Sequence, residues 1–187
     1  MTFWCNDPIQ ASVWPQDLGP RICIVGPSTT GKSTLARALA AKLGRPAVYL
    51  DQYAFVPNTD WCLRPQADFA ADHQRLIGGE KWVMEGNYTK LIAQRLERAT
   101  GLIWLDLPLI PAALRYVRRS LFGASTRVGT LTGAKGEFHW NMVHHILVVQ
   151  RRNRRKLQDH YDASTDLTRV RVCSMAELTA LHARWSL

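Results

Sequence analysis

The chain has 187 residues, of which 47% are hydrophobic and 21% are charged, and its formal net charge is +9. This length favours one domain with a sizeable core. The composition excludes a disordered chain, a collagen-like fibre and a coiled coil. No segment approaches the roughly 18 consecutive apolar residues that predict a membrane span. The first residues also lack the basic and apolar regions of a signal peptide.

The four cysteines lie far apart in the sequence and form no CxxC pair. This spacing is typical neither of a zinc site nor of a compact disulfide framework. We therefore expect reduced thiols and a cytoplasmic protein without a membrane partner.

The positive charge is concentrated in one segment. Residues 115–156 hold ten basic residues and one acid, Glu137, so this segment alone carries +9, while the remaining 14 basic and 14 acidic residues cancel. Such a segment suits a polyphosphate ligand, nucleic acid or a membrane surface. A merely solvated surface is the alternative, although solvated surfaces usually mix the two signs more evenly.

The secondary structure predicted along the chain begins with an irregular arm, because residues 1–20 hold three prolines and two tryptophans without any periodicity. From residue 21 onward, short apolar segments alternate with segments of helical spacing. Residues 52–64 read as a loop, and the four glycines of 123–136 favour a mobile lid. The expected strands are 21–26, 46–51, 81–85, 101–108 and 170–174. The expected helices are 34–44, 65–77, 89–99, 111–123, 138–161 and 175–185.

This alternation predicts an α/β fold in which five parallel strands are covered by helices on both faces. The strand segments agree, because they are continuously apolar, as expected of a sheet with no solvent-exposed face.

Residues 26–33, GPSTTGKS, fit the pattern GxxxxGK[ST] at every fixed position, between an expected strand and an expected helix. Gly26 and Gly31 let the backbone turn so that its N–H groups form an anion-binding nest with the helix N-terminus. Lys32 can reach the β- and γ-phosphates, and the Ser33 hydroxyl can bind Mg²⁺. A glycine turn with a surface lysine fits this context less well. The residues expected to bind ATP and Mg²⁺ here are Gly26, Ser28, Thr29, Thr30, Gly31, Lys32, Ser33 and Thr34.

Three acidic residues, Asp51, Glu85 and Asp106, end expected strands. Ligands bind beyond the carboxyl ends of the strands in such sheets. We expect Asp51 to bind the acceptor or act as a general base, and Glu85 to contact a Mg²⁺-bound water or act as a base. Each could instead cap a helix or a turn, which is the favoured interpretation for Asp106.

Two groups of arginines flank the glycine-rich segment, and within each group the spacing places three side chains on one helix face. A lid hinged between them would close cations over the γ-phosphate and exclude water. The first group is Arg115, Arg118 and Arg119, and the second is Arg151, Arg154 and Arg155. We expect Arg119 and Arg151 to act in catalysis, and Arg115, Arg154 and Arg155 to bind phosphates.

With these motifs, the chain resembles the adenylate kinase-like group of P-loop kinases, and more closely the small DNA topology modulation (FlaR-like) proteins. The resemblance covers residues 21–185. Its most specific part is WVMEGNYTKLIAQRLERATGLIWLDLP, residues 82–108. It is also carried by the segments 24–44, YLDQYAF (49–55), Trp61 with Arg64-Pro65, and RRNRRK (151–156).

The resemblance implies a nucleoside-monophosphate-kinase-like domain over residues 21–187, with 52–80 binding the acceptor and 122–140 forming the lid. It places Asp51 near the acceptor hydroxyl, Glu85-Gly86-Asn87 at the acidic strand end that leads into acceptor-binding residues, and the arginines around the phosphates. It also places residues 173–175 beside the adenine. The sequence departs from the family at Glu85-Gly86-Asn87-Tyr88-Thr89, where these kinases usually carry Asp-Gly-x-Pro-Arg. This departure disfavours AMP as the acceptor.

Three functions fit these residues. The favoured one is an ATP- and Mg²⁺-dependent kinase that transfers the γ-phosphoryl group to a hydroxyl or phosphate of a small acceptor. The second is a nucleotide-binding regulator that acts on DNA through the basic segment 115–156, although no nucleic-acid-binding motif is visible. The third is a kinase of a nucleic-acid hydroxyl.

Overall fold

The computed structural model describes residues 12–59, 61–122 and 148–187. Its centre is a sheet of five strands, all paired in parallel, in the order β2-β3-β1-β4-β5. This arrangement confirms the predicted α/β fold with a five-stranded parallel sheet. The strands are β1 (Arg21–Val25), β2 (Ala47–Tyr49), β3 (Trp82–Glu85), β4 (Gly101–Leu105) and β5 (Thr168–Val172).

Within the described residues, the helices lie close to their expected positions, with one addition, and residues 138–147 of the expected helix 138–161 lie outside the described part. The chain turns once at Asp51–Ala54 (α2), inside a segment expected to be strand end and loop. A single turn of four residues is too short to show a period in the sequence. The other helices are α1 (Lys32–Leu43), α3 (Gln66–Ile77), α4 (Ile92–Arg98), α5 (Leu109–Phe122), α7 (Gln150–Ala163) and α8 (Met175–Trp185).

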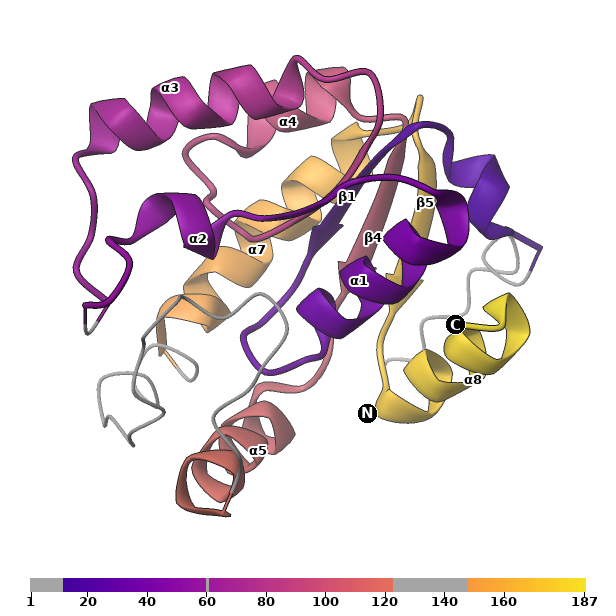
Figure 1. Ribbon diagram of the computed structural model, residues 1–187. Helices are drawn as coiled ribbons and strands as arrows, with labels where there is room; N and C mark the ends of the chain where they lie inside the picture. Colours follow the sequence, from indigo (N-terminus) through magenta and orange to yellow (C-terminus); the bar gives the residue numbers. More distant parts are fainter. Residues whose placement is uncertain (1–11, 60, 123–147) are drawn as a thin grey trace.

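Helices cover both faces of the sheet (Figure 1), and an apolar cluster lies on each face. On one face, Leu39 of α1 and Leu181 of α8 belong to a cluster of buried side chains. On the other, Phe69 of α3, Ile92 of α4 and Leu157 of α7 belong to a second cluster. Burying one such side chain contributes roughly 1.5–3 kcal/mol, so the sheet is fixed from both sides.

Local signals fix where the helices next to the P-loop begin and end. At the end of α1, Gly44 has φ 61° and donates its N–H to the Ala40 and Ala41 carbonyls, a left-handed cap that glycine adopts most readily. At the start of α8, the Ser174 hydroxyl accepts the Glu177 N–H at 3.1 Å. Such a cap contributes about 1 kcal/mol to the stability of the helix.

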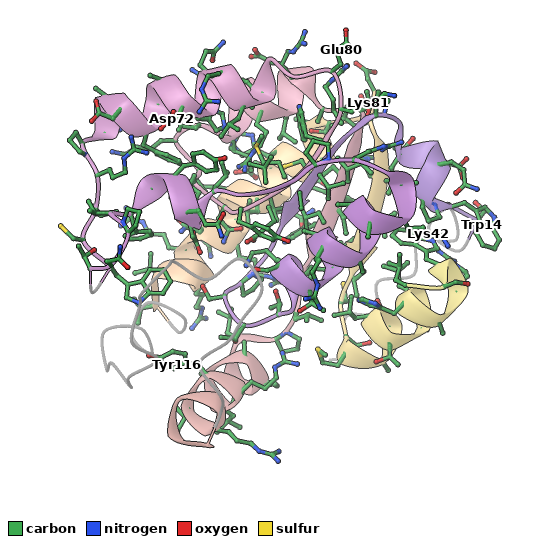
Figure 2. All side chains as sticks on the ribbon, viewed as in Figure 1. Trp14, Lys42, Asp72, Glu80, Lys81 and Tyr116 are labelled. Atoms are coloured by element: carbon green, nitrogen blue, oxygen red, sulfur yellow. The ribbon has the colours of Figure 1, made fainter. Side chains whose placement is uncertain are left out.

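Residues 12–20 of the expected arm pack against the domain, and residues 1–11 lie outside the described part. A short 3₁₀ helix, Pro15–Leu18, buries the Leu18 side chain in the core. The Val13 carbonyl accepts a hydrogen bond from the Trp185 indole of α8 at 3.0 Å. Trp14, which directly precedes the 3₁₀ helix, lies at the surface (Figure 2) and is half exposed.

The cysteines only partly match the expectation of four reduced thiols. Cys23 and Cys62 are free, but Cys173 is disulfide-bonded, so the expectation is wrong at that position. Across residues 12–59, 61–122 and 148–187, every helix is too short or too polar to cross a membrane.

Candidate functional site

A tight loop, residues 26–33, connects β1 to α1. Gly26 has φ 146°, and a Cβ there would lie 2.5 Å from the Leu105 carbonyl oxygen, so no larger residue fits. Gly31, with φ 95°, precedes the first residue of α1, and no side chain caps that end. The first N–H groups of a helix have no partner within the helix. The loop and helix start therefore form the donor-rich cradle that binds phosphate in such folds.

Hydrogen bonds within and beyond the loop fix its shape. The Thr30 hydroxyl donates to the Pro27 carbonyl at 2.7 Å, and the Lys32 ammonium donates to the same carbonyl at 2.8 Å. The Thr29 hydroxyl donates to the Ala112 carbonyl at 2.7 Å, which ties the loop to α5. The Lys32 charge is thus held at the cradle, where it can contact a phosphate.

Glu85, the last residue of β3, lies beside the start of α1. Its carboxylate accepts the Ser33 hydroxyl at 2.9 Å, and the residue is only 4% exposed. Burial raises the pKa of Glu85, the Lys32 charge opposes that rise, and the Asp51 charge adds to it. Lys32, Ser33 and Asp51, all expected site residues, therefore lie close enough to Glu85 to influence its pKa.

Asp51, the first residue of α2, lies near enough to Glu85 to raise its pKa, and it is also bound by Tyr88. The Tyr88 hydroxyl donates to Asp51 Oδ1 at 2.5 Å. Burial raises the pKa of Tyr88 most, and the Asp51 charge raises it further, so the phenol stays protonated at neutral pH. The two residues are 37 positions apart in the sequence, and the pairing of β2 with β3 brings them together.

Three residues of this site are not among the site residues predicted from the sequence: Asn87, Tyr88 and Arg95. Asn87 Oδ1 accepts the Gly26 N–H at 2.9 Å, so the loop after β3 holds the start of the phosphate cradle. Arg95 is fully buried and donates to the Asn87 carbonyl at 2.9 Å. The sequence does contain an indication of Arg95, because this arginine lies between Ile92 and Leu96 on the apolar face of an amphipathic helix.

Asp106 follows β4 and is paired with two arginines. Arg154 of α7 binds it with two nitrogens, at 2.6 and 2.8 Å, and Arg171 of β5 binds it with two, at 2.5 and 3.1 Å. The Arg171 guanidinium also lies 4.3 Å from the centre of the Trp104 ring. A carboxylate with four donor contacts is saturated, so Asp106 has a structural role, although as the partner of two arginines and not as the expected cap of a helix or turn.

A small hollow lies between the phosphate cradle and α7. It brings the loop residue Pro27 together with Arg154, which the sequence expects among the phosphate-binding residues. The residues that line it are Pro27, Asn87, Trp104, Asp106, Asn153, Arg154 and Leu157.

The other expected site residues are placed as follows. Arg115 of α5 is partly buried, and its Nε and Nη2 atoms have no partner within the described residues. Arg151 and Arg155 of α7 are exposed. The Arg119 side chain and residues 123–140 of the expected lid lie outside the described part. In the loop region, Ser28 is partly buried and Thr34 is exposed.

The donor set fits a magnesium ion together with a nucleotide. The Ser33 hydroxyl and the Glu85 carboxylate are hard oxygen donors 2.9 Å apart. Mg²⁺ commonly binds through one or two such groups, substrate phosphates and water. Within the described residues, no three acidic, histidine or cysteine side chains cluster as a self-contained metal cage.

Comparisons with known proteins agree with this geometry. The family model described as "ATPase family associated with various cellular activities (AAA)" matches residues 22–106, which include the phosphate cradle, Asp51 and Glu85. Among curated proteins, no sequence matches this chain.

Two solved structures have a similar fold. A shikimate kinase from Bacteroides thetaiotaomicron is 17% identical, with a TM-score of 0.50 over 88% of this chain and 95% of that one. A gluconokinase from Sinorhizobium meliloti 1021 is 17% identical, with a TM-score of 0.51 over 89% of this chain and 93% of that one. The chain therefore has the α/β fold of P-loop NTPases. The finer resemblance to DNA topology modulation proteins stays a prediction.

Proposed function

We propose that the protein is a Mg²⁺-dependent kinase that transfers the γ-phosphoryl group of ATP to a hydroxyl of a small acceptor. One observation carries the proposal: the Ser33–Glu85 pair and the Tyr88-bound Asp51 carboxylate lie at the carboxyl edge of the sheet, beside the phosphate cradle. A cradle alone supports nucleotide binding, whereas a second carboxylate beside it supports transfer to an acceptor. The two structural neighbours are both kinases, which supports the same class.

In this proposal, the backbone amides of 26–33 and Lys32 bind the β- and γ-phosphates. Ser33 and Glu85 would hold Mg²⁺, and a bound ion would supply positive charge against the phosphate oxygens. The buried position of Glu85 beside Lys32 keeps the ion's protein ligands fixed.

Asp51 acts as the general base in the transfer step. The acceptor oxygen forms a bond to the γ-phosphorus while the bond between that phosphorus and the β,γ-bridging oxygen breaks, and its electron pair leaves with ADP. The acceptor proton moves to the Asp51 carboxylate. Lys32, with Arg115 of α5 and the exposed Arg151 and Arg155 of α7, stabilises the charge on the transferring group.

The test is a panel of small hydroxyl compounds incubated with ATP and Mg²⁺ and scored by ADP release. We expect at least one compound to stimulate release by wild-type protein. Lys32→Ala should abolish that stimulation, because the substitution removes the cation at the cradle. Lys42→Ala is the matched control, since Lys42 is exposed in the last turn of the same helix (Figure 2).

Full activity of Lys32→Ala, or no stimulation by any compound, would contradict the proposal. Adding oligonucleotides to the panel separates the two alternative functions, a kinase of a nucleic-acid hydroxyl and a regulator that acts on DNA. Stimulation by oligonucleotides alone would indicate a kinase of a nucleic-acid hydroxyl. Salt-dependent binding of duplex DNA without phosphorylation would favour a regulator.

A further inference from the structure

The loop that follows β3 contacts three separate parts of the site within four residues. Glu85 accepts the Ser33 hydroxyl, Asn87 accepts the Gly26 N–H, and Tyr88 donates to Asp51. The proposed mechanism uses the first of these contacts to hold Mg²⁺ and gives Tyr88 no role.

The backbone takes up strained geometry to bring Tyr88 to Asp51. Gly86 has φ 134°, and a Cβ there would meet the Tyr88 ring at 3.2 Å and the Leu50 Cβ at 3.0 Å. Tyr88 itself has φ 32°, a backbone angle that residues other than glycine rarely adopt. Such geometry persists only where the surroundings hold it, and it concentrates at functional sites.

The surroundings that hold Tyr88 are visible on both sides. Its ring packs against Phe69 of α3, with ring centres 4.7 Å apart. The preceding carbonyl, of Asn87, is held by the buried guanidinium of Arg95. The Tyr88 hydroxyl therefore has little freedom, and the carboxylate that it binds is oriented by a rigid group.

The hydrogen bond occupies one of the two Asp51 carboxylate oxygens. Tyr88 binds Oδ1 at 2.5 Å, a short charge-assisted contact. Within residues 12–59, 61–122 and 148–187, no hydrogen bond or ion pair engages Oδ2. An acceptor hydroxyl that binds Asp51 thus meets Oδ2, on the side away from the phenol.

We propose that Tyr88 is a positioning residue that holds Asp51 by Oδ1 and so directs Oδ2 at the acceptor hydroxyl. This inference rests on the proposed kinase function. Tyr88 acts as a hydrogen-bond donor and takes no proton from the substrate. A pair of this kind matters because a displacement of about 1 Å at a reacting group can lower the rate about 100-fold.

The experiment compares wild-type protein with Tyr88→Phe, using ADP release with the best acceptor of the panel. We expect kcat to fall about 10- to 100-fold while the KM for ATP changes less than about twofold, because the ATP cradle is untouched. The ring and its packing remain, so the melting temperature should fall by no more than about 4 °C. Tyr161→Phe is the matched control, since Tyr161 of α7 belongs to the same apolar cluster and lies outside the proposed site.

A double variant separates positioning from a general structural role. If Tyr88 acts through Asp51, Tyr88→Phe should cause no further loss of kcat in an Asp51→Asn background. If the losses of the two single variants multiply in the double variant, or if Tyr88→Phe is as active as Tyr161→Phe, the inference is overturned while the kinase function stands. A wild-type protein that consumes no ATP with any acceptor would overturn both.

Discussion

His73 of α3 is a buried titratable group whose protonation should make the fold sensitive to acid. The side chain is fully buried, and neither ring nitrogen has a hydrogen-bond partner among the described residues. Burial, with a further contribution from the nearby Arg95 charge, lowers the pKa of His73 from 6.5 to about 4. The folded state therefore disfavours the imidazolium, whereas the unfolded chain accepts the proton freely.

The sign and size of the effect follow from this difference in pKa. Between pH 6.5 and about 4 the unfolded state binds more protons than the folded state, so the free energy of unfolding falls as the pH falls. Each unit of difference corresponds to about 1.4 kcal/mol. From pH 7.5 to pH 4, His73 alone should lower the free energy of unfolding by about 3 kcal/mol.

The assay is urea denaturation of wild-type protein and His73→Leu at pH 7.5, 6, 5 and 4. Leucine fills the buried space without a titratable group. Other titratable groups, such as Glu85, are common to both proteins and cancel in the comparison. The stability of the variant relative to wild type should rise by about 3 kcal/mol between pH 7.5 and pH 4. A relative stability that is the same at all four pH values would refute the reasoning.

Three further substitutions probe the cradle and its surroundings. Gly26→Ala places a methyl group 2.5 Å from a backbone carbonyl oxygen, so it should lower the melting temperature and weaken nucleotide binding at least about tenfold, as measured by thermal melting and calorimetry. Ser33→Ala removes the hydroxyl beside Glu85 and should raise the Mg²⁺ concentration for half-maximal ADP release about tenfold or more. Asp106→Asn takes the shared charge from two arginines, one of them half exposed, and should cost about 2 kcal/mol in urea denaturation; an unchanged unfolding midpoint would contradict this.

Much of the fold is predictable because its signals are local. The apolar strand segments and the Ala/Leu spacing of α1 directly reflect burial in a two-sided sheet. The glycines at 26 and 31 are required by backbone geometry that few other residues adopt, so a short motif identifies the cradle. The turn at α2 escapes prediction because it is stabilised by its surroundings rather than by a periodic pattern.

The site is only partly predictable, because its contacts join residues far apart in the chain. Strand ends point to Asp51 and Glu85, but nothing local indicates that Tyr88 reaches Asp51. Arg154, expected to bind a phosphate, is instead hydrogen-bonded to the Asp106 carboxylate. That pairing depends on the packing of α7 beside β4, which the sequence pattern does not specify.

Nucleotide binding at the 26–33 cradle is tested most directly by isothermal titration calorimetry with a non-hydrolysable ATP analogue and Mg²⁺. Wild-type protein and Lys42→Ala should show saturable binding at one site per chain, and Lys32→Ala should bind at least about tenfold more weakly. Absence of heat with wild-type protein, or equal affinity of all three proteins, would contradict the account.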